Sequence, residues 1–318
     1  MPGRDTPELV NVWLLRSRNQ RLVYRNSAMP KIERVASITN DLGEGPLWDH
    51  QSQSLFWVDS KLGRILRLSP DGSTDQFDLS EMIGSLAIVD NHQAIVALQT
   101  GLHLYSFHDN SLRLICDPEA NQSETRFNDG KTDRHGNFVV GTMGVTIRDR
   151  ALGSLYRLND RLEIEVLEDD VIVANGPCFS PDGSIFYFND GRRRILAYDY
   201  TPEGPPTNKR VFFDGKAHNT GSDGATVDSE GNIWVALTGS SEVGCIAPDG
   251  HLVERISMPI KLPSSVMFGG PSLDRLYVTS IHNSGNRISN EKNAGSLFCI
   301  TGLGAVGLPE RRFNLAAE

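Results

Sequence analysis

The stretch GPLWDHQSQSLFWVDSKLGRILRL, residues 45–68, holds three short apolar runs separated by turn residues. Its second and third runs, LFWV at residues 55–58 and ILRL at residues 65–68, are bounded by polar residues and glycine. Runs of this length and composition are typical of β-strands. Because no stretch of about twelve residues elsewhere in the chain shows a helical period, the chain is predicted to be nearly all β.

The same order of runs recurs along the chain. Similar units begin near residues 45, 85, 130, 176, 224 and 265, about 40 to 48 residues apart. A period of this length, with about four strands in each unit, is typical of propeller blades, which bury their faces only against neighbouring blades. We therefore predict an all-β fold, a six-bladed β-propeller over residues 31–318, preceded by a poorly ordered N-terminal extension over residues 1–30.

The composition argues against several classes of function. The formal net charge is −9, and an acidic chain is poorly suited to bind nucleic acid or an anionic membrane surface. The four cysteines are far apart and lack Cys-x-x-Cys spacing, which argues against a zinc cage or a redox pair. The residues before Met29 lack a signal-peptide core. We expect a cytoplasmic protein, a monomer or weak homo-oligomer, with no nucleic-acid or membrane partner.

The phase of the repeat places one position of each unit at the same mouth of the central channel, just before the strand that lines it. These positions are mostly polar, and they are Glu44, Gly84 or Ser85, Asn128 or Asp129, Asn175, Asp223, and Ser264 or Ser265. Converging carboxylate and amide oxygens suit a hard divalent cation such as Ca²⁺ or Mg²⁺. The same Asp-Gly and Asn-Gly pairs are also common turn devices, so the phase alone leaves both interpretations open.

Several short motifs, in their order and spacing, carry a resemblance to a known family. They are GEGPLW at residues 43–48, RFNDGK at 126–131, GTM at 141–143, NG at 175–176, DG at 223–224 and GSLF at 295–298. Over residues 32–313 the chain resembles the regucalcin and gluconolactonase (senescence-marker protein) family of six-bladed propeller lactonases. The resemblance implies an enzyme of carbohydrate metabolism, a hydrolase that opens a small sugar lactone to the aldonic acid.

The resemblance also implies roles for particular residues. Glu44, Asn175 and Asp223 would hold one divalent cation, and Arg126 and Asn128 would contact the substrate. The cation would polarise the lactone carbonyl, while Asp223 either assists the attack of water or serves only as a ligand. We expect Ca²⁺ at this site ahead of Mg²⁺, Mn²⁺ or Zn²⁺, which the same oxygen donors accept.

One departure from the family concerns the segment after the Thr-Met motif. Family members carry an acidic pair there, one member of which contacts sugar hydroxyls, whereas residues 144–148 read GVTIR and hold no carboxylate. Thr146 or Arg148 could replace the missing contact, and gluconolactone itself is in question as the substrate. Two other functions stay open, a non-catalytic Ca²⁺-binding propeller scaffold and a hydrolase of another ester class. Arg126 and Asn128 favour the enzyme, because a cation scaffold has no use for them.

Overall fold

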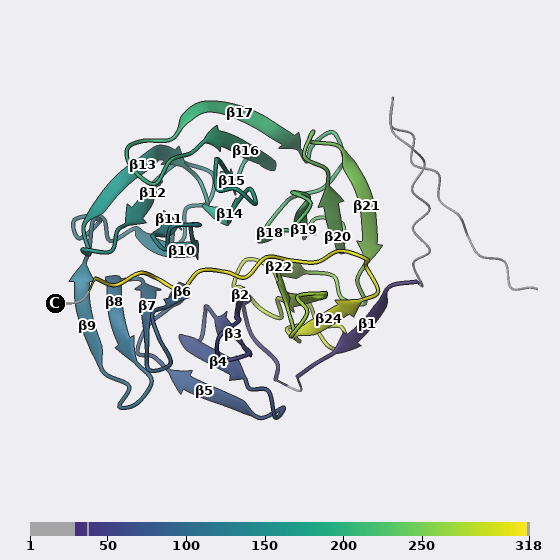
Figure 1. The fold of residues 1–318 in the computed structure, drawn as a ribbon, viewed down its shortest axis with the longest axis horizontal. Helices are drawn as coiled ribbons and strands as arrows, with labels where there is room; N and C mark the ends of the chain where they lie inside the picture. The colour runs from purple at the N-terminus through teal and green to yellow at the C-terminus, as the bar shows by residue number, and fades with distance from the viewer. Residues whose placement is uncertain (1–28, 37, 317–318) are drawn as a thin grey trace, which may run out of the picture.

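The computed structural model describes residues 29–36 and 38–316. In it, six sheets of four antiparallel strands are arranged as a ring around one axis (Figure 1). The predicted six-bladed β-propeller is therefore confirmed. The predicted N-terminal extension lies almost wholly outside the described residues. Within residues 29–36 and 38–316 no helix has the length and hydropathy needed to cross a membrane.

The strands fall into four positions, counted outward from the axis. The innermost strands are β2 (Gly43–Asp49), β6 (Ile83–Ile88), β10 (Thr125–Thr132), β14 (Asn175–Phe179), β18 (Ala225–Val227) and β22 (Pro263–Gly269). The second strands are β3 (Ser54–Asp59), β7 (Gln93–Leu98), β11 (Phe138–Gly144), β15 (Ile185–Asn189), β19 (Ile233–Leu237) and β23 (Arg275–Ser280). The third strands are β4 (Arg64–Leu68), β8 (Gly101–Ser106), β12 (Gly153–Leu158), β16 (Arg194–Asp199), β20 (Glu242–Ile246) and β24 (Phe298–Thr301). The outermost strands are β5 (Thr74–Asp78), β9 (Leu112–Cys116), β13 (Ile164–Val171), β17 (Thr207–Asp214), β21 (Leu252–Ser257) and β1 (Lys31–Arg34).

The ring is closed by its own N-terminal strand. The sixth sheet has the order β1-β24-β23-β22, with Lys31 opposite Thr301 and Arg34 opposite Phe298. Its outermost strand thus comes from the start of the described chain, and its other three strands come from near the C-terminus (Figure 1). This pairing ties together the two ends of the repeat series, which the spacing of the repeats did not predict.

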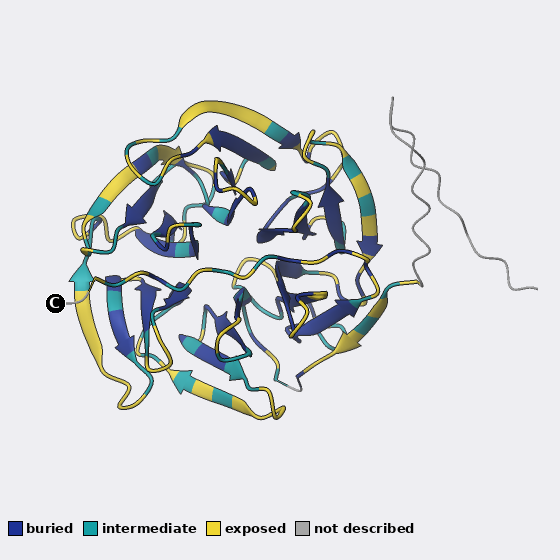
Figure 2. Cartoon of the chain, viewed as in Figure 1, coloured by how far each residue is buried: buried dark blue, intermediate teal, exposed yellow. Residues whose placement is uncertain are grey.

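Six apolar clusters fill the six interfaces between neighbouring sheets. Between the first and second sheets, for example, Phe56 and Val58 pack with Leu86 and Val96. Between the fifth and sixth sheets, Trp234 meets Phe268 edge-on with ring centroids 5.8 Å apart. The inner strands are buried, whereas the outermost strands alternate between exposed and partly buried residues (Figure 2). This packing fixes where the innermost strands begin, and the candidate site lies at those strand ends.

The C-terminal segment, residues 302–316, crosses the ring at the end opposite the starts of the innermost strands (Figure 1). The Phe313 amide donates to the Ile88 carbonyl at 2.7 Å, and the Asn314 amide donates to the Gly136 carbonyl at 2.9 Å. Phe313 is buried among the residues of the second and third sheets. We call this end of the ring the closed end, and the other end, where the innermost strands begin, the mouth.

Candidate functional site

The innermost strands are irregular where they begin, at the mouth. Five of the six shift their pairing register within their first few residues, for example between Glu44 and Leu47 in β2 and between Asn175 and Cys178 in β14. The sixth, β18, begins only at Ala225, two residues after Asp223. A bulge bends a strand and redirects its side chains. The repeated irregularity therefore turns one polar side chain of several blades toward the axis.

Two glycines at these bulges need a backbone that other residues rarely adopt. Gly45 and Gly176 have φ values of 50° and 57°, in the left-handed region that glycine enters without steric cost. A Cβ atom on Gly176 would lie 2.7 Å from the carbonyl oxygen of Asp223. Glycine at position 176 therefore lets the strand that carries Asn175 approach the backbone at Asp223.

Asp223 is a buried carboxylate with little compensation. Its Oδ2 accepts a hydrogen bond from the Thr238 hydroxyl at 3.2 Å. Loss of water is the largest influence on it, and together with the nearby negative charge of Asp129 it raises the pKa of Asp223 to about 7, against the opposing effect of Arg287 and Thr238. A carboxyl with this pKa exchanges a proton close to neutral pH.

Glu44 lies within electrostatic reach of the carboxylates of Asp223 and Asp129. Loss of water, followed by the negative charges of Asp223 and Asp129, raises the pKa of Glu44 well above its ordinary value, and Arg126 offsets only part of this. Three acidic side chains from three different blades therefore repel one another at the mouth. Like charges held in one site favour the neutral forms unless a cation joins them.

Asn175, Asn128 and Arg126 form a hydrogen-bonded chain beside these carboxylates. The Nδ2 of Asn128 donates to Oδ1 of Asn175 at 2.6 Å and to the carbonyl of Ala174 at 2.8 Å. Arg126, which is 4% exposed, donates from Nη1 to Oδ1 of Asn128 at 3.0 Å. The structure thus brings together all five residues that the sequence singled out, from four different blades.

Asp129 is an additional member of the site, which the repeat phase offered only as an alternative to Asn128. It is buried, and its two oxygens accept hydrogen bonds from the amides of Gly130 at 2.9 Å and Gly176 at 2.8 Å. Loss of water raises its pKa above the ordinary value, although these amides and Lys131 oppose that change. Asp129 therefore holds the β10 bulge against Gly176, next to Asn175.

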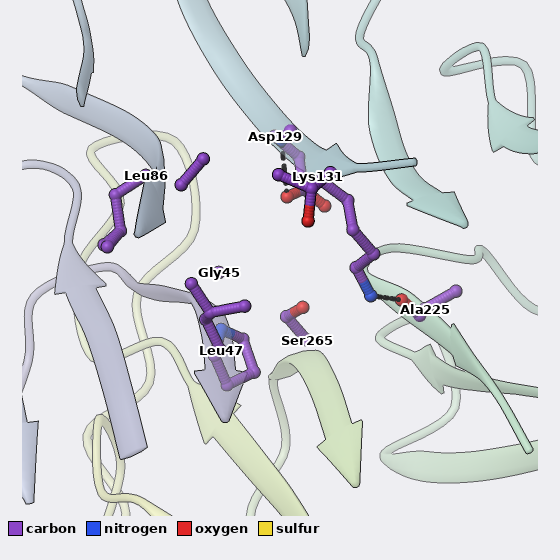
Figure 3. Close-up of a pocket in the computed structure, with 11 residues that line it drawn as sticks. Gly45, Leu47, Leu86, Asp129, Lys131, Ala225 and Ser265 are labelled. Carbon is purple, nitrogen blue, oxygen red and sulfur yellow. Dashed lines mark hydrogen bonds between the residues drawn. The ribbon is translucent and has the colours of Figure 1, made fainter. Parts of the chain in front are cut away.

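Beneath the site, the axis is filled by side chains. The Nζ of Lys131 donates to the carbonyl of Ala225 at 3.0 Å, and Leu47 and Leu86 approach from two other blades (Figure 3). The space left among them is about 10 Å³, enough for about one water molecule. The axis beneath the carboxylates therefore has no room for a ligand larger than water.

The donor atoms at the mouth fit a hard divalent cation. Two carboxylates and one amide supply oxygen ligands of the kind that Ca²⁺ and Mg²⁺ prefer. Within the described part of the chain no three His, Cys, Asp or Glu side chains are grouped as metal ligands, so the third donor here would be the Asn175 amide. The pKa values of Glu44 and Asp223 are raised although Arg126 and Arg287 oppose the rise, and a bound cation would favour the ionised forms of both carboxyls.

Comparisons with known proteins agree with this architecture. Residues 42–282 match the family described as the SMP-30/gluconolactonase/LRE-like region. The chain is 34% identical to a 6-deoxy-6-sulfogluconolactonase of Pseudomonas putida, over 80% of this chain and 87% of that protein. It is also 34% identical to an L-arabinolactonase of Azospirillum brasilense, over 83% of this chain and 89% of that protein. A solved structure of regucalcin from Agrobacterium tumefaciens, described as a calcium-binding protein, superposes with a TM-score of 0.83 at 29% identity and covers 89% of this chain and 97% of that one.

Proposed function

The chain belongs to the SMP-30/gluconolactonase/LRE-like family and is a lactone-hydrolysing hydrolase, and we propose that it opens a sugar lactone to the aldonic acid with a divalent cation bound at the mouth. The observation that carries the proposal is that Glu44 and Asp223 lie within electrostatic reach of each other, while Asn175, hydrogen-bonded to Asn128, precedes a glycine packed against the backbone of Asp223. Carboxylates whose ionised forms are disfavoured by loss of water and by one another's charge are costly to a fold. Their presence at an open end of the ring is best explained by a ligand that they bind.

Glu44, Asn175 and Asp223 would hold the cation through side-chain oxygens, with Ca²⁺ expected ahead of Mg²⁺, Mn²⁺ or Zn²⁺. When bound, the cation would polarise the lactone carbonyl and stabilise the negative charge that develops on its oxygen. The relatives named as sulfogluconolactonase, arabinolactonase and regucalcin support a sugar lactone and a divalent cation.

The side chains around this spot account for the remaining chemistry. An oxygen of Asp223 accepts a proton from the attacking water, and the proton then passes to the ring oxygen as the C–O bond breaks. The hydroxyl of the water stays on the carbonyl carbon and gives the acid. The buried guanidinium of Arg126 orients a substrate oxygen, and its hydrogen bond to Oδ1 of Asn128 fixes the amide orientation in which Nδ2 of Asn128 bonds to Oδ1 of Asn175.

The proposal is tested by removing and restoring the cation. Lactone hydrolysis is followed by acid release in a pH-indicator assay, first on the protein treated with a chelator and then after addition of Ca²⁺, Mg²⁺, Mn²⁺ or Zn²⁺. We expect activity to vanish with the chelator and to return with at least one of the four cations. Hydrolysis that persists at full rate in the chelated protein contradicts the proposal.

Two variants make the result specific. Glu44→Gln is expected to abolish calorimetric cation binding and hydrolysis together, because it removes one of the charged ligands. Glu163→Gln is the matched control, because Glu163 is 63% exposed and pairs loosely with Arg161 at 3.5 Å. If Glu44→Gln loses cation binding but no lactone is hydrolysed by the unaltered protein, the chain is a cation-binding scaffold and the enzymatic proposal is wrong.

A further inference from the structure

Two loops at the mouth are longer than their counterparts in the other sheets. They connect second to third strands and comprise residues 145–152, between β11 and β12, and residues 281–297, between β23 and β24. In the other four sheets the same connection has two to four residues, namely 60–63, 99–100, 190–193 and 238–241. Second strands run back toward the mouth, so both long loops border the candidate site. Each carries an arginine that the proposed mechanism does not use.

Arg148, in the first loop, lies beside Arg126. Its Nη2 donates to the carbonyl of Val145 at 3.3 Å, and its Nη1 lies 4.0 Å from the sulfur of Met143. Met143 pairs directly with Arg126 across strands β10 and β11. Burial, followed by the like charge of Arg148, lowers the pKa of Arg126 to about 10. The guanidinium of Arg148 is therefore held next to the substrate-binding arginine.

Arg287, in the second loop, acts electrostatically on the same group of side chains. The backbone amide and carbonyl of Arg287 both bond to Ser284, which closes a turn. The loop is anchored to the first blade, because the amides of His282 and Asn283 donate to the carbonyl of Asp41. The charge of Arg287 opposes the rise in the pKa of Asp223, and it lowers the pKa of Arg148. Arg287 thus lies within electrostatic reach of both the candidate catalytic carboxylate and Arg148.

Neither of these arginines has an acidic partner. Within the described residues, no carboxylate oxygen lies within 4.0 Å of Arg148 or Arg287, although Arg67, Arg194 and Arg312 all pair with aspartates at 2.6 to 2.7 Å. Arg287 is exposed, where an unpaired arginine is ordinary, whereas Arg148 is half-buried and lies within electrostatic reach of both Arg126 and Arg287. Such an arrangement is unfavourable until an anion joins it.

We propose that Arg148 and Arg287 bind an anionic substituent on the lactone, so that the preferred substrate is a sugar lactone bearing a carboxylate, phosphate or sulfonate outside its ring. The planar guanidinium group matches the paired oxygens of all three anions. The inference rests on the proposed lactonase function, and it assigns the two long loops to substrate selection. The carbonyl is attacked over Asp223, while the anion is held by the loops beside it.

The test compares neutral and anionic substrates of one shape. kcat/KM is measured for glucono-1,5-lactone and for lactones in which the C6 hydroxymethyl group is replaced by a carboxylate, a phosphomethyl or a sulfomethyl group. We expect at least one anionic lactone to exceed the neutral one, and the best of the three identifies the anion. In the double variant Arg148→Met/Arg287→Met, kcat/KM for the anionic lactone divided by kcat/KM for the neutral lactone should fall by about 100-fold. Each charge-assisted contact contributes about tenfold, and the variant removes two of them.

Arg161→Met is the matched control, because Arg161 lies beyond the opposite end of the same strand, β12, and is 73% exposed. It should leave the ratio unchanged. If the neutral lactone is hydrolysed at least as well as the anionic ones and the double variant keeps their ratio, this inference is wrong while the proposed function stands. If no lactone is hydrolysed, calorimetry with the cation-loaded protein decides. Tighter binding of 6-phosphogluconate than of gluconate, lost in the double variant, then supports the anion site, and equal binding refutes it.

Discussion

Strand β2 carries an acidic residue near each end, and the two ends differ in how that charge is treated. Asp49, at the closed end, is buried, but Nη2 of Arg312 binds it at 2.6 Å and the Ser52 amide at 3.0 Å. Burial alone would raise the pKa of Asp49, yet these hydrogen bonds and the charge of Arg312 lower it overall. At the mouth, the pKa of Glu44 is raised. At Asp49 the partners outweigh burial, whereas at Glu44 burial and the like charges of Asp223 and Asp129 outweigh Arg126.

The fifth blade repeats this contrast around β18. Asp228, on the side of the closed end, accepts hydrogen bonds from the amides of Glu230 and Asn232, from Nδ2 of Asn232 and from Nε1 of Trp234, all at 2.8 to 2.9 Å. Asp223, at the mouth, accepts one side-chain bond, from Thr238. In this blade the carboxylate at the closed end thus has four hydrogen-bond donors, whereas the carboxylate at the mouth, where a ligand would bind, has one side-chain donor.

The largest expected effect comes from exchanging the two aspartates of this blade for asparagine, one at a time. Asp223→Asn should lower kcat by about 10²- to 10³-fold or more, because it removes a charged ligand and proton acceptor at the reacting centre. Asp228→Asn should leave kcat within about twofold but lower the free energy of unfolding by about 1–3 kcal/mol, because the amide nitrogen would face two of the four donors that now bond to the carboxylate. Steady-state kinetics and urea unfolding of both variants measure the difference.

The contrast between the two ends fails if both variants lose activity to the same degree while remaining folded. It also fails if Asp223→Asn unfolds at a markedly lower urea concentration than Asp228→Asn. Circular dichroism at the assay temperature separates lost function from lost structure.

A second prediction concerns pH and the protein freed of divalent cations. The pKa of Asp223 is about 7 in the fold, against an ordinary value of 3.8. Below about pH 4 the carboxyl is protonated in both the folded and unfolded states, so its burial does not lower the free energy of unfolding. Between pH 4 and 7 only the unfolded chain releases the proton, and above 7 the folded protein bears the full cost of the buried charge.

The free energy of unfolding of Asp223→Asn minus that of the unaltered protein should therefore rise from pH 4 to pH 7 and then level off. Urea unfolding in chelator across this range measures it, and Ca²⁺ should reduce the rise because the cation favours the ionised carboxylate. A difference that is flat with pH would show that Asp223 is better compensated than its surroundings indicate. Asp49 behaves in the opposite sense, because its lowered pKa makes its stabilising contribution decline as the pH falls.

The repeat period was sufficient to predict the ring, its six blades and the positions at which polar side chains reach the axis. The repeat phase offered Glu44, Asn175 and Asp223 together with Asn128 or Asp129, and the family resemblance selected the first three as the predicted ligands. Arg126 followed from the family resemblance alone. These are local signals, since an apolar run and a polar residue before glycine are both visible within a few residues.

Other features depend on contacts between distant parts of the chain. The closure of the sixth sheet by β1 and the pairing of Asp49 with Arg312 join residues more than 250 positions apart. The long loops carry no period, so nothing in the spacing placed Arg148 and Arg287 near one another. Asp129 was visible in the sequence, but its bond to the Gly176 amide arises only when neighbouring bulges meet.

The smallest expected effect sharpens the contrast at a single hydrogen bond. The Thr238 hydroxyl lies 3.2 Å from Oδ2 of Asp223 and 2.7 Å from the carbonyl of Pro263, and its one proton can serve only one acceptor fully. Because the shorter bond goes to Pro263, Thr238→Val should lower kcat by only about two- to fivefold, at the low end of the contribution of a hydrogen bond. It should also move the pH at which Asp223 titrates upward, since Thr238 opposes the rise in that pKa. Ser240→Ala, in the same loop as Thr238, is the control: it removes a hydroxyl bonded to the Leu237 carbonyl and to the Thr220 hydroxyl and should leave the pH profile in place. A loss as large as that of Asp223→Asn would mean that Thr238, and not the cation, is the main partner of the carboxylate at the mouth.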